Sequence, residues 1–223
     1  MREAFRKAAL RLYEYCAYPA ARYKILFRFL DTPYEDKALR ELRPAFHASD
    51  LVEELCQEQD YNGGWGPLQS KDYSVKARFP TSMTAISRCL YIGLTIEDRD
   101  LLLRAYEYLE DFLKGTSREK LYKGGPVGPH AVRVVAETAR SAAAGVGRGN
   151  AAASRRTRGA ARLVLGQNAG GLWDWDPQTK DPWGYFGYFS TNRNYKHNRI
   201  VDCSMEVLNF LKTYIDHNKE THK

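Results

Sequence analysis

The chain has 223 residues, a net charge of +7 and 13% aromatic residues. This length supports one domain with a sizeable core, and the aromatic content excludes disorder for most of the chain. No run approaches the roughly 18 apolar residues of a membrane span. The charges within residues 1–7 interrupt any apolar core of a signal peptide, and the four cysteines form no CxxC pair. We therefore expect free thiols and a cytoplasmic location.

The positive charge is confined to one segment of the chain. Residues 126–166 contain seven Arg and one Glu, whereas the rest of the chain has 27 basic and 26 acidic residues. A basic surface is the usual footprint of a nucleic-acid-binding domain. Because the remainder of this chain is close to neutral, we expect no nucleic-acid partner for the folded part.

The same segment, residues 126–166, also differs in composition. Ala, Arg, Gly and Val make up 30 of its 41 residues, and no aromatic residue occurs among them. Three interpretations fit: a disordered basic linker, an arm that binds RNA or a membrane surface, and a stretch translated out of frame from GC-rich DNA. We expect the segment to lie outside the core, between N-terminal helical repeats over 1–125 and a C-terminal repeat over 167–223.

The expected secondary structure is helical throughout. Residues 2–16 read as an amphipathic helix, and Pro19 interrupts the chain after it. Asp50 and Glu53 give a later helix an acidic first turn. No convincing strand pattern appears, so the expected fold class is all-α. In chain order, the expected helices are residues 2–16, 22–30, a short one between Pro33 and Pro44, 50–59, 81–94, 101–114 and 199–215.

One pattern occurs twice and indicates a helical repeat. Both copies have the spacing L-x3-Q-x3-G-x-W, and a Ser-Met pair lies in the helix that follows each. Leu and Gln one turn apart share a helix face, and glycine lets the chain leave the helix with positive φ. The pattern predicts that both Trp rings are buried beside the turn. The copies are Leu55, Gln59, Gly63 and Trp65, then Leu163, Gln167, Gly171 and Trp173.

The Gln-x3-Gly-x-Trp pattern, followed by a helix of small residues, resembles the repeat of the squalene-cyclase and protein-prenyltransferase superfamily. The resemblance covers residues 48–114 and 163–216. It implies a partial α/α toroid, with inner and outer helices around a central apolar cavity. It also implies an apolar or isoprenoid-like ligand and, if the chain is an enzyme, an isoprenoid transferase or cyclase. Fold alone does not fix activity, because one toroid serves several functions.

The catalytic motifs of that superfamily are not evident in this chain. The D-x-D-D acid motif of the cyclases is absent, and Asp-Trp-Asp-Pro over 174–177 is interpreted as a turn at a helix boundary. The prenyltransferase zinc ligands have no match, because adjacent Asp202 and Cys203 point about 100° apart on a helix. A buried Cys beside a hydrogen-bonded Asp is the simpler interpretation. We expect no metal and no cofactor, and the catalytic residues stay unknown.

A loop rich in aromatic residues, from Trp183 to Arg199, is the candidate ligand surface. Its rings would form a wall for an apolar body. His197 and Arg199, near the N-terminus of the next helix, would favour an anionic group such as a lipid diphosphate. The ligand-binding candidates are Trp183, Tyr185, Tyr188, Tyr195, His197, Arg199 and Asp202.

Two alternatives to isoprenoid binding remain at this point. In the first, the aromatic rings cover one end of a non-catalytic structural or interaction domain. In the second, a glycan-processing (α/α) barrel uses Asp174, Asp176 or Asp202 as acid and base. Paired carboxylates in a cleft would favour glycan chemistry, a closed apolar cavity would favour isoprenoids, and a filled centre would favour a structural role.

Overall fold

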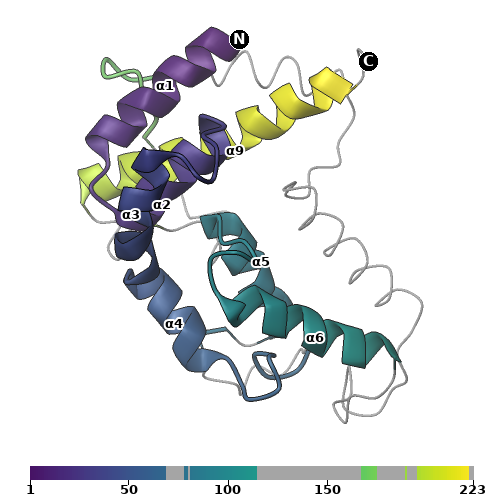
Figure 1. The fold of residues 1–223 in the computed structure, drawn as a ribbon. Coiled ribbons are helices and arrows are strands. Elements are labelled where there is room, and N and C mark those ends of the chain that lie inside the picture. Colours follow the sequence, from purple (N-terminus) through teal and green to yellow (C-terminus); the bar gives the residue numbers. More distant parts are fainter. Residues whose placement is uncertain (69–77, 80, 115–166, 175–188, 190–194, 221–223) are drawn as a thin grey trace. The chain divides into compact units, whose positions relative to one another are not determined.

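The computed structural model describes residues 1–68, 78–79, 81–114, 167–174, 189 and 195–220 (Figure 1). Within these ranges the chain consists of helices and their connections, without a strand, so the all-α prediction is confirmed. The chain divides into two compact units, residues 1–46 with 148–223 and residues 47–147. The basic segment 126–166 lies outside the described residues.

The first unit is assembled on one long C-terminal helix. Its elements are α1 (Arg2–Tyr15), α2 (Pro19–Lys24), the π-helical turn η1 (Ile25–Phe29), α3 (Lys37–His47, whose last residue belongs to the second unit) and α9 (Lys196–Glu220). α1 packs against α9 and η1 (Figure 1). Its buried residues Phe5, Ala8, Ala9 and Leu12 recur at helical spacing and form one apolar face. Phe5 meets Phe29 edge-on, with 6.0 Å between ring centroids.

The prolines bear on the predicted helix bounds. Pro19 separates α1 from α2 as predicted, but it is itself the first residue of α2, so this helix starts before the expected residue 22. No N–H is needed there, because the first turn has no intrahelical acceptor. Pro44, which was expected to bound the third helix, lies inside α3. It removes one helical hydrogen bond. The fully buried Leu39 and Phe46 nevertheless hold α3 on the core, and Phe46 stacks on Tyr23 at 4.2 Å.

The sequence predicts a last helix that is too short. α9 runs from Lys196 to Glu220 rather than over 199–215. Its first turn is polar and lacks apolar periodicity, which is typical of a loop. In the structure Asn198 is buried, and its Oδ1 accepts a 2.6 Å hydrogen bond from the Tyr18 hydroxyl. A contact between two residues that are 180 positions apart in the sequence thus stabilises a helical turn that local propensity does not favour.

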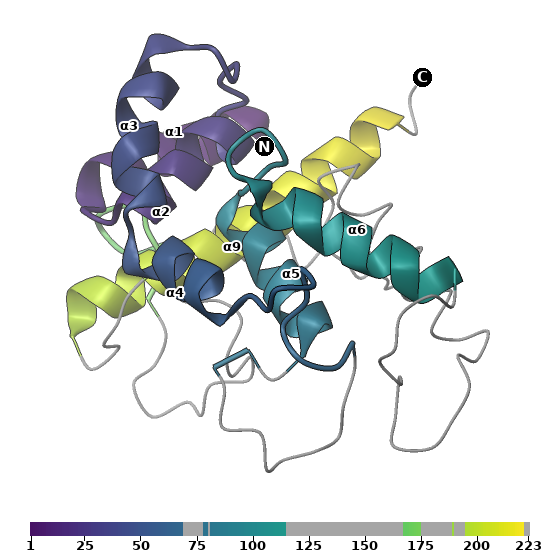
Figure 2. The same ribbon diagram turned by 60° about the horizontal axis from the view of Figure 1, so that its bottom comes forward.

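The second unit contains three helices among its described residues. They are α4 (Asp50–Glu58), α5 (Ser82–Ile92) and α6 (Asp100–Lys114). α5 packs against both α4 and α6 (Figure 2). Thr81 caps α5, since its side chain accepts a hydrogen bond from the Thr84 N–H at 3.2 Å. Ser82 and Ala85 are fully buried, and their small size lets neighbouring elements approach α5 closely.

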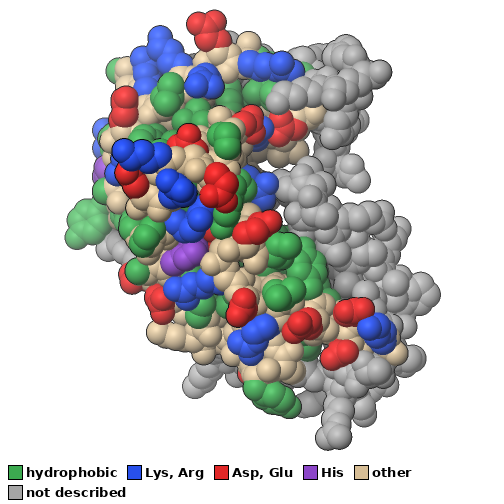
Figure 3. Space-filling view, in the orientation of Figure 1, with side chains coloured by type: hydrophobic (Ala, Val, Ile, Leu, Met, Phe, Trp, Pro, Cys, Tyr) green, Lys and Arg blue, Asp and Glu red, His purple; other side chains and the backbone are tan. Residues whose placement is uncertain are grey.

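The described surface mixes charges of both signs. On the face drawn in Figure 3, Lys and Arg side chains are interspersed with Asp and Glu. None of the described helices combines the length and the apolar composition needed to cross a bilayer. All four cysteines are free of disulfide bonds; Cys56 is half-buried and the other three are buried.

Candidate functional site

The first repeat forms a hydrogen-bonded turn between α4 and α5. Gln59 Nε2 donates to the carbonyl of Gly63 at 2.9 Å, and Gly63 has a φ of +87°. Beyond the turn, the N–H of Trp65 donates to Ser82 Oγ at 2.8 Å, and this hydroxyl donates in turn to the Gly66 carbonyl at 3.0 Å. The Gln therefore closes the turn, and the Ser attaches it to the helix that follows.

The second repeat uses the same contacts. Gln167 Nε2 donates to the carbonyl of Gly171 at 2.8 Å, and Gly171 has a φ of +73°. The N–H of Trp173 donates to Ser204 Oγ at 3.0 Å. The backbone closes both turns alike, from Asp60 N–H to Gly64 O at 2.8 Å and from Asn168 N–H to Leu172 O at 2.7 Å. Leu163, the first residue of this copy, lies outside the described residues.

Both repeated tryptophans are buried, as the sequence predicts. Trp65 is 1% exposed and Trp173 is 4% exposed. Trp65 Nε1 also donates to the Leu55 carbonyl at 2.8 Å, so its ring is held against the end of α4. The Gln amide, the Trp ring and the Ser hydroxyl serve internal contacts in these turns. The repeats therefore position the chain and do not themselves present a reactive group.

The sequence-predicted ligand residues divide into two groups. Trp183, Tyr185 and Tyr188 lie outside the described residues. The others lie on or next to the first two turns of α9, where Tyr195 is 66% exposed. His197, which was assigned to the loop, belongs to α9, and Arg199, which was expected to start the helix, is its fourth residue. The helix starts earlier because Asn198 between them is buried and bonded to Tyr18.

The start of α9 brings an aromatic pair and an ion pair together. The ring of His197 stacks on Tyr15, with 4.5 Å between centroids and 28° between planes. Arg199 Nε lies 3.3 Å from Asp174 Oδ1, next to the second repeated Trp. Partial burial raises the pKa of Tyr15, and the negative charge of Asp174 adds to this shift. The arrangement combines rings, cations and one carboxylate at a single helix end.

A buried polar layer lies one turn further along α9. Asp202 is 0% exposed, and its Oδ1 accepts a hydrogen bond from the Phe189 N–H at 2.8 Å. Burial raises the pKa of the neighbouring Cys203 thiol to about 12. Burial, with the charge of Asp202, also raises the pKa of Tyr18. Cys203 is thus a buried cysteine beside a hydrogen-bonded Asp, as predicted from the sequence. Over the described ranges, no group of three His, Cys, Asp or Glu side chains could hold a metal ion.

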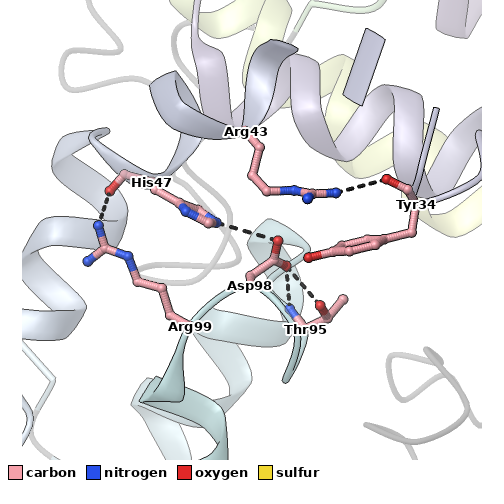
Figure 4. Close-up of polar contacts among 6 residues, drawn as sticks. All are labelled: Tyr34, Arg43, His47, Thr95, Asp98 and Arg99. Atoms are coloured by element: carbon pink, nitrogen blue, oxygen red, sulfur yellow. Dashed lines mark hydrogen bonds and ion pairs between the residues drawn. The ribbon is translucent and has the colours of Figure 1, made fainter. Parts of the chain in front are cut away.

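Sequence reasoning missed a polar network in the second unit (Figure 4). His47 Nε2 lies 3.4 Å from Asp98 Oδ1, and the other carboxylate oxygen accepts hydrogen bonds from the N–H and hydroxyl of Thr95 at 2.8 and 2.9 Å. Arg99 Nη2 donates to the His47 carbonyl at 3.0 Å. These residues fix the connection before α6. His47 is 51 residues from Asp98 and belongs to no motif, so no local signal could have joined them.

The first-unit pair in Figure 4 is local. Arg43 Nη2 donates to the Tyr34 carbonyl at 2.8 Å, and the guanidinium carbon lies 3.8 Å from the centroid of the Tyr34 ring. A guanidinium over an aromatic face is a favourable cation–π arrangement. This pair holds the segment that precedes α3 against that helix and suggests no chemistry.

The second unit has a hollow lined mainly by polar and charged residues. It has a volume of about 410 Å³ and lies between the end of α4 and the start of α6. Arg99 Nη1 donates to Cys56 Sγ at 3.0 Å within it. Its lining residues are Cys56, Gln59, Arg99, Asp100, Leu101 and Arg104.

Comparison of the chain with protein families, curated proteins and solved structures gives no match. Its function must therefore be argued from the geometry of its own residues. The start of α9 and the hollow beside α6 are two places where charged groups and either aromatic rings or a thiol lie together.

Proposed function

We propose that this protein binds an amphiphilic ligand with an anionic head and an apolar body, of the isoprenoid diphosphate kind, at the N-terminal end of α9. The proposal retains the resemblance of the repeats to those of squalene cyclases and prenyltransferases, and with it a toroidal arrangement of helices. A reducing, cytoplasmic setting goes with it, because none of the four cysteines is in a disulfide. The proposal assigns binding only and names no catalytic residue.

The observation that carries the proposal is the charge of the first turn of α9. The N–H groups at a helix N-terminus carry partial positive charge, so acidic residues are favourable there. α9 has no acidic residue in its first turn and carries Lys196, His197 and Arg199 instead. Asp174 offsets part of this charge through Arg199. An anionic head group would offset the rest, using a charge-assisted contact with the helix end.

Aromatic rings beside this charge would receive the apolar body. Tyr15 stacks on His197, and Tyr195 is largely exposed next to the helix start. Tyrosine rings give a large contact area at low entropic cost, and exposed ones are available to a ligand. The sequence adds Trp183, Tyr185 and Tyr188 to the same stretch of chain.

The test is a titration of intrinsic Trp fluorescence with a non-hydrolysable farnesyl diphosphate analogue. We expect saturable binding that Lys196→Ala and Arg199→Ala each weaken about twofold to fivefold, since one charge contact at a helix end contributes roughly 0.3–1 kcal/mol. Trp183→Ala should weaken binding as well. Lys114→Ala is the matched control, because it removes one exposed cation, which pairs with Glu110 on the same helix at 2.7 Å.

Two results would count against the site. One is the absence of saturable binding at millimolar ligand. The other is an equal loss of affinity in Lys114→Ala and Arg199→Ala, which would show a non-specific charge effect. A titration with inorganic diphosphate distinguishes the contributions of the anionic head and the apolar body to affinity. Diphosphate can make the charge contacts, but it has no apolar body to contact the aromatic rings.

A non-catalytic structural or interaction domain is the second candidate. The observation in its favour is that both repeat turns use Gln, Ser and the buried Trp for internal contacts. The glycan-processing alternative has less support. Asp202 is fully buried and Asp174 is paired with Arg199, while Asp176 lies outside the described residues. Failure of the ligand titration would leave the structural role as the better explanation.

A further inference from the structure

The hollow beside α6 contains a thiol whose surroundings differ from those of the other three. Cys56 is half-buried, and Arg99 Nη1 donates to its sulfur at 3.0 Å. The other three cysteines are buried. Burial raises the pKa of Cys16 to about 11 and that of Cys203 to about 12, and it also raises the pKa of Cys89. Thiols buried in this way are inert, whereas thiols that are accessible and next to an Arg are the reactive ones.

The rest of the lining carries three charged groups. Arg99 and Arg104 provide two guanidiniums, and Asp100 provides one carboxylate. The volume of about 410 Å³ falls at the low end of the roughly 300–1,000 Å³ typical of small-molecule sites. The hollow therefore suits a ligand of tripeptide size or smaller, with charges opposite to those of the lining.

Both guanidiniums are held in place by the protein. Arg99 Nη2 donates to the His47 carbonyl at 3.0 Å and lies 3.3 Å from Glu53 Oε1. Arg104 Nη2 donates to the Asp60 carbonyl at 2.8 Å. Glu53 offsets part of the charge of Arg99, so Arg104 is the guanidinium with no carboxylate among its described partners. Such fixed side chains lose little entropy when a ligand binds.

We propose that this hollow binds a carboxylate-bearing disulfide of the glutathione type and that Cys56 takes up one half of it. The Cys56 thiolate attacks one sulfur of the disulfide, a new S–S bond forms and the old one breaks. The departing thiolate takes up the proton that Cys56 released. The disulfide reagent is reduced in the exchange, so no other oxidant is needed. The product is a mixed disulfide, which excess thiol reverses.

The charges of this reagent match those of the lining. One glutathionyl half carries two carboxylates and one ammonium group at neutral pH. The hollow offers two guanidiniums for the carboxylates and Asp100 for the ammonium group. Contacts between a guanidinium and a carboxylate are charge-assisted, and they are therefore stronger than hydrogen bonds between neutral groups. The site uses residues of the second unit, whereas the ligand proposed above binds at α9 in the first unit. The two proposals can therefore be tested independently.

The experiment treats the full-length protein with oxidised glutathione and follows adducts by intact mass and peptide mapping. We expect one adduct per chain, on Cys56, and none in Cys56→Ser. Arg104→Gln should slow the reaction at least fivefold. Lys114→Gln should leave the rate unchanged, because it removes the same charge from the same helix, far from the hollow and in an exposed position.

A neutral reagent, bis(2-hydroxyethyl) disulfide, separates recognition from intrinsic thiol reactivity. Arg104→Gln should leave the rate of Cys56 with this reagent unchanged. Unfolding of the variant would instead expose all four thiols and raise the number of adducts with both reagents. The proposal is overturned if another cysteine of the folded protein reacts as fast as Cys56. It is also overturned if Arg104→Gln affects the two reagents equally.

Discussion

The two copies of the repeat build one turn in different surroundings. In both, a Gln side chain donates to a glycine carbonyl and a Trp N–H donates to a Ser hydroxyl. The space beside the two glycines differs. A Cβ on Gly63 would lie 2.2 Å from the backbone oxygen of Arg104, whereas a Cβ on Gly171 would meet Nη1 at the tip of the Arg11 side chain. The repeated pattern specifies the turn, and tertiary packing decides what a change in it costs.

Between each turn and the helix that follows it, a carboxylate binds the backbone of the chain, but this carboxylate comes from a different place in the two copies. In the first, Glu58 on α4 accepts the N–H of the buried Phe79 at 2.9 Å. In the second, Asp202 on α9 accepts the N–H of the buried Phe189 at 2.8 Å. A carboxylate holds a Phe N–H in each case, but one comes from before the turn and the other from after it. This carboxylate is therefore not part of the repeated sequence pattern.

The helices that follow the two turns also start differently. α5 begins at Ser82, which binds the first Trp N–H, whereas α9 begins about two turns before the corresponding Ser204. His197, Arg199 and Asp202 all lie in this extension of α9. The second copy therefore carries charged groups that the first lacks, which is why the ligand site is proposed there.

The largest difference in stability between the two copies should appear when Gly63→Ala is compared with Gly171→Ala. Both place alanine in a left-handed conformation, which costs roughly 1–2 kcal/mol. At Gly63 the new Cβ also overlaps the backbone of α6, so we expect a loss above about 4 kcal/mol or failure to fold. At Gly171 the Arg11 side chain can move aside. Urea unfolding measures both, and equal losses would contradict the difference in packing.

Truncating the repeated tryptophans should give the next largest effect. Trp65→Ala and Trp173→Ala should each lower the free energy of unfolding by roughly 3–5 kcal/mol, because each ring is fully packed. Trp65→Phe should cost about 1–3 kcal/mol, since the buried Leu55 carbonyl loses its donor. A loss below about 1 kcal/mol for Trp173→Ala would show that the second copy does not stabilise its unit as the first does.

Removing the Ser hydroxyls tests the attachment of each turn to its helix. Ser82→Ala should cost roughly 2–3 kcal/mol, because the buried Trp65 N–H loses its acceptor and the Gly66 carbonyl loses its donor. Ser204→Ala should cost about 1–2 kcal/mol, since its two contacts with Trp173, at 3.0 and 3.3 Å, are longer. Hydrogen exchange of the two Trp amides should accelerate in the corresponding variant only. Acceleration at both amides would indicate global loosening.

Alkaline pH should have the smallest of these effects on stability, and it should act on the first unit. Burial raises the pKa of Cys16 from 9.0 to about 11 and that of Cys203 to about 12. The unfolded chain loses these protons near pH 9 and the folded chain does not, so stability falls as pH rises from 9 through the folded values. At pH 10 the loss should be about 1 kcal/mol for each thiol. Cys16→Ala should reduce this slope, and an unchanged slope would show that the thiol does not contribute.

Local signals were enough to predict part of this structure. The acidic first turn at Asp50 and Glu53 marks the start of α4, and the helix expected from residue 81 starts within one residue of α5. The L-x3-Q-x3-G-x-W spacing predicts both turns and both buried rings, because each turn closes on residues within about ten positions of one another. Such contacts depend on neighbouring residues and need no knowledge of the rest of the fold.

The remaining features depend on contacts that no local pattern encodes. α9 starts at Lys196 because Tyr18 binds Asn198, and the start of α6 is fixed by His47 through Asp98. The sequence by itself determined the helical class and the repeated turn. Only the tertiary structure decided which charges meet at the start of α9 and which thiol lies beside Arg99, because burial and charge pairing depend on segments brought together by folding.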